Sequence, residues 1–444
     1  MKTSRYNILL EEGDCVLAYN CLTGALLKMD KEQYADHLLV PDGNISTSDT
    51  LKRRNIITSL KRGGFIVEDD FDEIEFIKAK HFSRRFGSQI LSLVVAPTLD
   101  CNFACPYCYE PEKKAEYMTE EIETRLVEYI GQRLRSMSAL DVTWFGGEPT
   151  LAIETMYRLS EQFHKKAAEN GARYSETITT NGYNLTKEVA VRLRNIAGDV
   201  KAQVTLDGPP EVHNARRPLT DGGGSFHVIV NNLEEIAGIV MPVVVRVNLS
   251  RENFHSLPKL LDILVDRRLQ KRLSLYVAPT DVRPGVCQSA SDYALDVPRF
   301  AKMEAEAQMM LLDRGFRMCG IMEPLDIYCP AVYADRLIVA PNGDIHRCMQ
   351  TIDDPKERMG NIMEPTTIDK NDLKWMAWNP FEREECLNCE VLPLCMGGCT
   401  YKYMQMEKRP PVADSDRWVS LKYNIREIIR SRYRQHLLAK STKE

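Results

Sequence analysis

Six short apolar segments between residues 88 and 280 constrain the fold of this chain more than any other feature. They read QILSLVVAP, LDVTWF, SETITT, KAQVTL, PVVVRVNL and RLSLYVAP. Apolar, β-branched runs of this length are typical of strands buried in a parallel sheet. Helical patterns lie between them, the clearest over residues 119–135. The sequence therefore predicts repeated β–α units and an α/β fold.

Six β–α units can form either an open doubly wound sheet or most of a barrel, and periodicity does not distinguish the two. Both architectures place ligands beyond the carboxyl ends of the strands. Four loops at those ends carry residues that can do chemistry: Cys101–Cys108, Gly146–Pro149, Asn181–Gly182 and Asp207–Gly208. We expect these loops to meet on one rim.

The flanking segments have different patterns. Residues 1 to about 80 contain three strand candidates, helical patterns near 31–39 and 48–62, and a last strand candidate in GGFIVEDD, as in a small α+β unit. After about residue 318 the chain is irregular and rich in cysteine, with a hairpin signal at Pro341–Asp344. We expect three parts: an α+β unit at 1–85, a β–α core at 86–315 and a cysteine-rich domain at 316–444.

Composition excludes several classes of function. The net charge of −5 gives no field that favours nucleic acid or a membrane surface as a partner. No apolar run approaches the roughly 18 residues that cross a bilayer, and the N-terminus lacks the pattern of a signal peptide. We therefore expect a cytoplasmic protein. In that reducing compartment its thirteen cysteines are metal ligands or reactive thiols rather than disulfides.

The loop after the first strand, CNFACPYCYE, holds Cys101, Cys105 and Cys108 within eight residues. Three thiolates leave a zinc site one ligand short, and no Cys or His follows within the next fifty residues. Zinc remains the competing interpretation. Three thiolates suit three irons of a [4Fe–4S] cube, whose fourth iron then takes a ligand from outside the chain.

This spacing, C-x3-C-x2-C with an aromatic residue before the last cysteine and a GGEP segment after the second strand, resembles the radical S-adenosylmethionine (SAM) enzymes. In that family SAM binds the fourth iron through its amine and carboxylate. Reductive cleavage of SAM then yields a 5′-deoxyadenosyl radical, which abstracts hydrogen. The resemblance implies a partial (β/α)6, TIM-like barrel, with a SAM-binding [4Fe–4S] cluster on Cys101, Cys105 and Cys108.

The same resemblance assigns further rim residues to SAM. In the family the GGEP segment holds the SAM amine through its backbone and acid, although a plain tight turn would also explain it. Thr205 and Arg217 match contacts to the SAM carboxylate and ribose, and Tyr107 matches a residue near the adenine. Arg246 either contacts the cofactor or satisfies a core acid. The expected SAM-binding residues are Tyr107, Gly146, Gly147, Glu148, Pro149, Asn181, Thr205, Arg217 and Arg246. No catalytic residue is assigned.

A second group of cysteines has the spacing of the SPASM domain, an auxiliary-cluster module of radical SAM peptide maturases. Cys329 is followed after thirteen residues by Gly343 and after four more by Cys348, and the motif C-x2-C-x5-C-x3-C then begins at Cys386. By this resemblance, auxiliary [4Fe–4S] cluster I is bound by Cys319, Cys329, Cys348 and Cys399. Auxiliary cluster II is bound by Cys386, Cys389 and Cys395.

The SPASM match is incomplete, because the family pattern ends with a seventh cysteine and residues 400–444 contain none. Either Asp414 or Asp416 supplies an oxygen ligand, or the fourth iron is open, or cluster II is absent. The chain is therefore expected to carry one or two auxiliary clusters. A structural zinc on Cys386, Cys389, Cys395 and Cys399 is the alternative.

Two further features bear on function. Sulfatase-maturating relatives have an Asp base after the cysteine of the G-x4-C element, where this chain has Met349, and a thioether cannot take a proton. The N-terminal unit resembles winged-helix-like peptide-recognition elements, to which a leader peptide adds as an extra strand. A purely structural cap is the alternative.

The resemblance therefore implies a radical SAM maturase of a ribosomally made precursor peptide. It would form a thioether (sactionine-type) or another side-chain crosslink, with electrons from a flavodoxin- or ferredoxin-type donor. A sulfatase-maturating enzyme and a non-enzymatic iron–sulfur or zinc protein are the alternatives. Cys15, Cys21 and Cys287 are expected to be small buried or incidental thiols. The arginines of the basic helical pattern over 418–438 are expected to form a solvated face.

Overall fold

The computed structural model describes residues 1–34, 50–108, 115–280, 295–318, 323–364, 369–406 and 419–441. The chain divides into two compact units. The terminal unit comprises Met1–Gly87, Gly320–Pro330 and Asn379–Glu444, and the barrel unit comprises Ser88–Cys319 and Ala331–Trp378. Both ends of the chain thus belong to one unit, while Cys348 belongs to the other.

The barrel unit is built on six parallel strands that follow one another in chain order. A doubly wound sheet reverses its strand order, and this sheet does not, so the partial (β/α)6 barrel is confirmed. The strands are β6 Ile90–Val95, β7 Ala139–Trp144, β8 Arg173–Thr180, β9 Val200–Thr205, β10 Val243–Leu249 and β11 Ser274–Pro279.

Four short strands extend this sheet at its two ends. β12 (Arg317–Met318) pairs in parallel with β11, and β13 (Arg336–Val339) pairs in parallel with β6. β14 (Asp344–His346) and β15 (Gly360–Asn361) follow in antiparallel pairing. The predicted hairpin is therefore confirmed between β13 and β14, where Gly343 takes a φ of +83°. It places Cys348 two residues beyond the end of β14.

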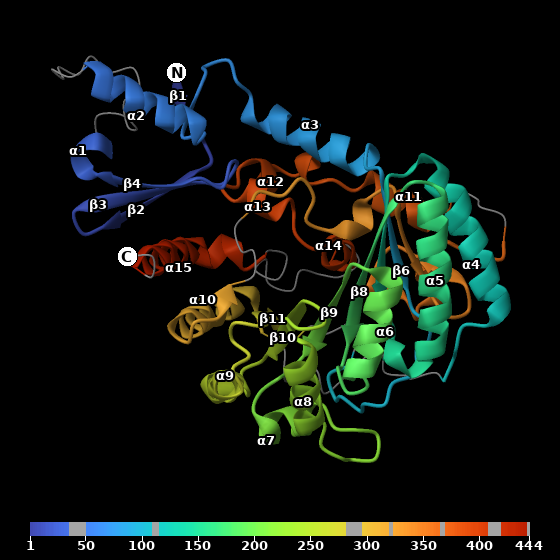
Figure 1. The fold of residues 1–444 in the computed structure, drawn as a ribbon. Helices are drawn as coiled ribbons and strands as arrows, with labels where there is room; N and C mark the ends of the chain where they lie inside the picture. The colour runs from blue at the N-terminus through green and yellow to red at the C-terminus, as the bar shows by residue number, and fades with distance from the viewer. Residues whose placement is uncertain are drawn as a thin grey trace. The chain divides into compact units, whose positions relative to one another are not determined.

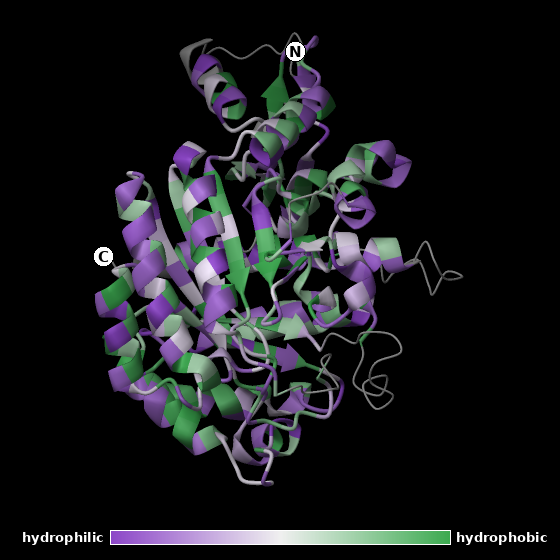
Figure 2. Ribbon diagram, turned by 90° about the vertical axis from the view of Figure 1, so that its right-hand side faces the viewer, coloured by the Kyte–Doolittle hydropathy of each residue, from purple (hydrophilic) through white to green (hydrophobic). Residues whose placement is uncertain are grey.

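Helices cover the barrel sheet, and α4, α5 and α6 lie side by side along it (Figure 1). They are amphipathic: α4, for example, buries Leu126 and Ile130, and Thr119 caps it by accepting a hydrogen bond from the backbone of Ile122. Figure 2 shows strands of the sheet in hydrophobic colours and helices of mixed colour around them. The helices are α4 Glu120–Arg133, α5 Ile153–Glu169, α6 Lys187–Ala197, α7 Pro210–Arg216, α8 Phe226–Ile236, α9 Leu257–Asp266, α10 Val297–Asp313 and α11 Lys370–Ala377.

The three predicted strands of the terminal unit form an antiparallel sheet, in the order β2–β3–β4. Part of the predicted helix at 31–39 is α1, while residues 35–49 lie outside the described residues. The elements are β1 Lys2–Thr3, β2 Asn7–Glu12, β3 Cys15–Asn20, β4 Leu26–Asp30, α1 Lys31–Tyr34, α2 Thr50–Arg62, β5 Ile66–Val67, α3 Glu73–Phe86, α12 Glu384–Leu387, α13 Leu392–Cys395, α14 Thr400–Met406 and α15 Leu421–Ser441.

Short 3-10 turns occur at Leu134–Ser136, Pro149–Ala152, Phe254–Ser256, Pro330–Val332, Met349–Thr351, Pro355–Glu357 and Pro380–Glu382. Within the described residues, no helix combines the length and the apolar composition needed to cross a bilayer.

One hydrophobic core holds the two ends of the chain together in the terminal unit. Tyr6, Ile8 and Leu17 pack there with Leu394 and Ile428. Arg426, Arg430 and Arg434 of the basic helix α15 are exposed, as expected from the sequence, and two of them also make contacts with the sheet. Arg426 Nη1 donates to the Leu9 carbonyl at 3.0 Å, and Arg430 Nε donates to Glu12 Oε1 at 2.5 Å, so both arginines contact β2.

Candidate functional site

The two glycines after β7 pack directly against the chain that leads into the cysteine loop. Gly147 N–H donates to Thr98 O at 3.3 Å, and Glu148 N–H donates to Asp100 O at 2.8 Å. A Cβ on Gly146 would lie 2.2 Å from Thr98 O, and one on Gly147 would lie 2.3 Å from Asp100 O. Only glycine allows this approach. The GGEP segment thus fixes the position of the residues immediately before Cys101.

Glu148 is fully buried and its carboxylate is occupied by protein donors. Oε1 accepts from Thr150 N at 3.1 Å, Thr150 Oγ1 at 2.5 Å and Thr180 Oγ1 at 2.7 Å, while Oε2 accepts from Asn181 N at 2.7 Å. Burial raises the pKa of Glu148, and these hydrogen bonds oppose that rise. Pro149, with no N–H to satisfy, opens the 3-10 turn that leads into α5. The acid therefore joins the ends of β7 and β8, and its contact with SAM stays a prediction.

The cysteine loop is also tied to the loops after β8 and α7. Asn181 Nδ2 donates to Asn102 Oδ1 at 2.7 Å. Ala104 N–H donates to Pro218 O at 2.8 Å, and Thr220 N–H donates to Asn102 O at 3.0 Å. The loops that were expected to share one rim are thus connected by hydrogen bonds.

Tyr107 is the centre of a buried network on this rim. Its hydroxyl donates to Asp207 Oδ2, accepts from Arg217 Nη1 at 2.7 Å, and lies 3.4 Å from Asn248 Nδ2. One donated and two accepted bonds use the full capacity of a phenol. Burial raises the pKa of Tyr107, Arg217 opposes the rise, and Asp207 adds to it. Tyr107 therefore remains a proton donor.

Arg216, which the sequence analysis did not assign to the site, completes this network. Its guanidinium lies over the Tyr107 ring at 4.9 Å, and its Nε is 3.5 Å from Asp207 Oδ2. Both Arg216 and Asp207 are buried, so the two charges compensate each other in the interior. We call Tyr107, Asp207, Arg216, Arg217 and Asn248 the rim network. In the sequence, this network is indicated by Asp207, an acid that follows a strand, and by the adjacent arginines Arg216 and Arg217.

His213 is a packed and hydrogen-bonded residue beside this network. Its Nδ1 accepts from the backbone N–H of Asp207 at 3.2 Å, and its Nε2 lies 3.1 Å from Ser225 Oγ. Burial lowers the pKa of His213 to about 3, with Arg217 adding to the decrease. The imidazole is therefore neutral, and it holds the backbone of Asp207 in place.

Thr205 and Arg246 are brought together by the pairing of β9 with β10, in which they are register partners. Thr205 is buried at the end of β9. Arg246 Nε donates to Asn248 Oδ1 at 2.8 Å. Because Asn248 Nδ2 reaches the Tyr107 hydroxyl, Arg246 is linked to the rim network through one amide.

The three cysteines of the loop are half-buried thiols, and none of them forms a disulfide. The backbone N–H of Phe103 points at Cys101 Sγ, at 3.4 Å. Within the described ranges, no three His, Cys, Asp or Glu side chains converge to hold one metal ion. A [4Fe–4S] cube makes a different demand, because each thiolate binds a separate iron. Three thiols on one loop, with an N–H directed at sulfur, are a donor set that fits a cube.

The cysteines of the second zone are divided between the units. Cys386, Cys389 and Cys395 lie in the apolar core of the terminal unit, as buried or half-buried thiols. Cys329 and Cys399 are half-buried in the terminal unit, and Cys348 is half-buried in the barrel unit. The predicted ligands Cys319, Asp414 and Asp416, and the thiol of Cys287, lie outside the described residues. The ligand sets of both auxiliary clusters remain predictions.

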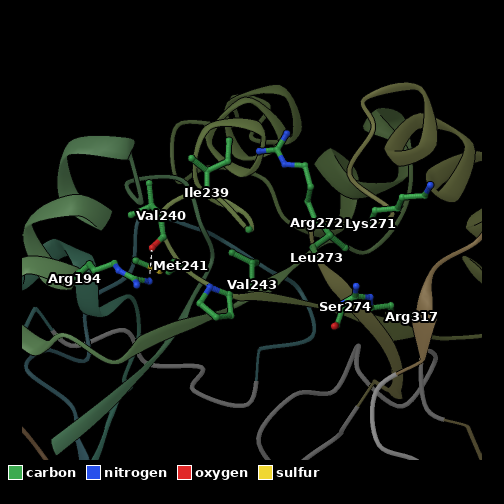
Figure 3. Close-up of a pocket in the computed structure, with 12 residues that line it drawn as sticks. Arg194, Ile239, Val240, Met241, Val243, Lys271, Arg272, Leu273, Ser274 and Arg317 are labelled. Atoms are coloured by element: carbon green, nitrogen blue, oxygen red, sulfur yellow. Dashed lines mark hydrogen bonds between the residues drawn. The ribbon is translucent and has the colours of Figure 1, made fainter.

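A cavity of about 550 Å³ lies at the amino-terminal ends of β10, β11 and β12 (Figure 3). Arg194, Lys271, Arg272 and Arg317 line it together with backbone, and Arg194 Nη1 donates to Val240 O at 2.7 Å. Barrels bind ligands at the carboxyl ends of their strands, and none of the rim residues lines this cavity. It is therefore separate from the candidate site.

Comparisons with known proteins agree with this geometry. Residues 95–264 match the model of the Radical SAM superfamily. The radical SAM cyclopropyl synthase TigE of Paramaledivibacter caminithermalis is 22% identical over 445 residues, which cover 89% of each chain. The serine-type anaerobic sulfatase-maturating enzyme of Klebsiella aerogenes is 24% identical over 319 residues, covering 67% of this chain and 76% of that one.

Two solved structures share the fold. That of anSMEcpe with bound AdoMet and Cp18Cys peptide matches with a TM-score of 0.58 and 19% identity, covering 79% of this chain and 99% of that one. That of Streptococcus suis SuiB bound to precursor peptide SuiA matches with a TM-score of 0.51 and 14% identity, covering 94% of this chain and 98% of that one. These likenesses show that the fold of the chain is shared with both structures.

Residues 95–264 therefore form a radical SAM domain. Enzymes of this superfamily use a [4Fe–4S] cluster and SAM, and auxiliary clusters are typical of the SPASM-type relatives. The chain thus carries the domain of a radical SAM enzyme, and the relatives that it resembles include a radical SAM cyclopropyl synthase and an anaerobic sulfatase-maturating enzyme.

Proposed function

We propose that this enzyme forms a side-chain crosslink in a ribosomally made precursor peptide, with a thioether between a cysteine sulfur and a carbon atom as the first candidate. The observation that carries the proposal is the extent of the likeness to SuiB, whose structure was solved with precursor peptide SuiA. That likeness covers 94% of the chain, whereas the likeness to anSMEcpe covers 79%.

The environment of Met349 supports a crosslinking reaction over sulfatase maturation. Its side chain packs against an apolar cluster that includes Val94, Ala96, Phe145 and Ile338. A thioether in apolar surroundings cannot act as a proton acceptor. The position expected to carry the base of a sulfatase-maturating enzyme therefore carries none.

The chain's own residues would hold and orient the cofactors. Cys101, Cys105 and Cys108 would bind the cluster, which when reduced supplies the electron that cleaves SAM and so starts hydrogen abstraction. Arg217 lies close enough to Cys105 for the two charges to interact, and its guanidinium suits a carboxylate such as that of SAM. Tyr107 and Asp207 would keep Arg217 in place.

Forming the thioether removes two hydrogens from the peptide. One leaves as a hydrogen atom to the 5′-deoxyadenosyl group, and the other leaves as a proton from the cysteine thiol. The remaining electron must also leave the product, and an auxiliary iron–sulfur cluster provides an acceptor for it. A flavodoxin- or ferredoxin-type protein would supply the first electron.

The terminal unit offers a sheet for leader recognition. Its outer strands are β2 and β4, and Arg426 and Arg430 from α15 already contact β2. We therefore assign leader addition to β4, where backbone groups of an outer strand can pair with an incoming peptide.

The test is an anaerobic reaction of the reconstituted enzyme with SAM, a reductant and a candidate precursor peptide chosen from the short reading frames beside its gene. We expect 5′-deoxyadenosine, together with a peptide lighter by two hydrogen atoms and blocked at its cysteine thiol. The Cys101→Ala, Cys105→Ala, Cys108→Ala variant should lose one cube and all SAM cleavage. An unmodified precursor peptide in the presence of active SAM cleavage would contradict the proposal.

Sulfatase maturation is the second candidate, favoured by the likeness to the Klebsiella aerogenes enzyme. It predicts that a serine or cysteine in a sulfatase-derived peptide is oxidised to formylglycine. The two peptides can be offered in the same assay, so that mass spectrometry identifies which one changes.

A further inference from the structure

Four cysteines, not three, lie in the apolar core of the terminal unit. Cys386, Cys389 and Cys395 are joined there by Cys21, which comes from the other end of the sequence. Cys21 is fully buried, at 0% exposure. Cys386 and Cys395 are buried in the same cluster, and Cys389 packs against it, so all four thiols belong to one core.

The local structure holds Cys21 firmly at this place. It follows the last residue of β3, and its backbone N–H donates to Tyr6 O at 2.9 Å. The preceding Asn20 is fully buried, and its side-chain amide donates to Asn7 Oδ1 and Gly64 O, both at 2.8 Å. Asn20 Oδ1 accepts from the backbone of Leu22 at 3.1 Å. The turn that carries Cys21 is therefore rigid.

The other three cysteines lie on a compact succession of turns. The N–H of Cys389 donates to Cys386 O at 3.1 Å, and the N–H of Cys395 donates to Val391 O at 3.0 Å. Met396 follows in a left-handed conformation, with a φ of +43°. The three cysteines are thus held on one short and tightly turned segment.

A buried cysteine is most often only a small apolar residue. Here the neighbours are three thiols that the SPASM resemblance assigns to one cube, and that cube lacks its fourth cysteine. A [4Fe–4S] cube takes four thiolates when it is fully ligated by protein. The cube lacks one cysteine ligand, and the Cys21 thiol lies in the same apolar core as the other three cysteines.

We propose that Cys21 is the fourth ligand of auxiliary cluster II, together with Cys386, Cys389 and Cys395. The inference rests on the predicted cluster and not on the proposed crosslinking reaction. Each thiol gives up its proton on binding iron, and no oxidant or reductant is needed. Cluster II is then closed to substrate and serves electron transfer. The strand that precedes Cys21 is the central strand of the sheet assigned to leader recognition, so the cluster also braces that sheet.

The test compares two cysteines of the same strand region. Cys15 begins β3, is half-buried, and its thiol lies 3.1 Å from Glu12 O, so Cys15→Ala is a matched control for Cys21→Ala. Both substitutions are made in the full-length Cys101→Ala, Cys105→Ala, Cys108→Ala variant, where all remaining iron belongs to auxiliary clusters. Iron and sulfide are counted, and electron paramagnetic resonance spectra are recorded before and after mild oxidation.

An iron of a [4Fe–4S] cube that has lost its thiolate ligand is released easily. We expect the Cys21→Ala protein to lose about one iron per chain on mild oxidation and to show a new [3Fe–4S] signal. The Cys15→Ala protein should keep the iron and the spectrum of its parent. Equal behaviour of the two variants would overturn the proposal.

A second pair of measurements separates ligation from folding. Cys21→Ser keeps the size of the side chain and should also show the [3Fe–4S] signal, while its far-ultraviolet circular dichroism matches that of Cys15→Ala. The Cys386→Ala, Cys389→Ala, Cys395→Ala variant should lose a whole cube. If it retains all the iron of its parent, or if the parent contains zinc, cluster II is absent and the proposal fails. Crosslinking is measured with the enzyme that carries no substitutions. A failure of the crosslinking proposal is therefore distinguished from a failure of the proposal about Cys21.

Discussion

At the scale of single residues, the rim is organised around a tyrosine that joins three separate parts of the chain. Tyr107 comes from the cysteine loop, Asp207 follows β9, and Arg217 follows α7. Because Tyr107 and Asp207 are buried and Arg217 is half-buried, each polar group depends on the others for its partner. The network therefore fixes the position of the Arg217 guanidinium.

Replacing Tyr107 with Phe should disturb this network without changing the shape of the core. Asp207 loses a donor and Arg217 loses an acceptor, which costs about 1–3 kcal/mol for buried groups. We expect a lower midpoint of anaerobic thermal unfolding and a raised KM for SAM in the production of 5′-deoxyadenosine. Tyr183→Phe, at a ring that packs against Phe103, is the control and should leave KM unchanged. An unaltered KM in Tyr107→Phe would show that the hydroxyl does not position the SAM site.

The buried imidazole of His213 should make stability depend on pH. Its pKa is about 3 in the folded chain and about 6.5 when unfolded. Between these values the unfolded chain binds a proton that the native chain does not, so stability is lost as pH falls below about 6.5, by roughly 1 kcal/mol for each pH unit. His213→Gln keeps an acceptor and a donor but cannot titrate.

The variant should therefore show a shallower decline in the free energy of urea unfolding between pH 6 and pH 5. His81 and His346, whose pKa values are also lowered mainly by burial, remain in both proteins and contribute equally. Identical slopes would mean that His213 is protonated in the native state.

At the scale of elements, the loops on the rim are held by backbone contacts more than by side chains. The chain at Gly146–Gly147 touches the carbonyls of Thr98 and Asp100, and both contacts exclude a Cβ. The glycine pair is thus required by the approach of two loops, whatever further contact it makes with a ligand. The same contact explains why the GGEP segment directly follows β7.

Gly147→Ala should displace the cysteine loop, because its Cβ would lie 2.3 Å from one carbonyl oxygen and 2.5 Å from another. Strain of this kind costs about 1–3 kcal/mol or more. We expect reduced iron content after reconstitution and loss of SAM cleavage. Gly360→Ala, at a glycine with no heavy atom within 4 Å of the added Cβ, should retain both. Full iron in Gly147→Ala would contradict this account.

At the scale of the whole molecule, the two ends of the chain build one unit. β2 and β3 share a core with the turns around Cys386–Cys395 and with α15. The proposed leader recognition and the proposed ligands of auxiliary cluster II are thus assigned to the same unit.

Leader recognition by this unit predicts a particular kinetic pattern. Removing the leader from the precursor peptide should raise KM by about tenfold or more while kcat changes little, because the lost contacts are equal in ground and transition states. Adding the leader as a separate peptide should restore no more than part of the affinity, since the linkage supplies an effective concentration. Equal KM values with and without the leader would assign the N-terminal sheet a structural role.

The sequence alone determined the β–α repeat, the positions of the six barrel strands and the identity of the cysteine loop. These follow from local information: apolar runs, turn residues and ligand spacing are all read within about ten residues. The three strands before residue 31 and the hairpin at Pro341–Asp344 were predicted for the same reason.

Only the tertiary structure decided what the local patterns leave open. The order of the strands distinguished the barrel from a doubly wound sheet. Folding also placed Arg216 on Asp207, Arg426 on β2, and Cys21 in one core with Cys389. The residues of each pair lie between 9 and over 400 positions apart, and no spacing rule links them. Their proximity results from burial of apolar surface by the whole chain, which is a collective property that no single segment carries.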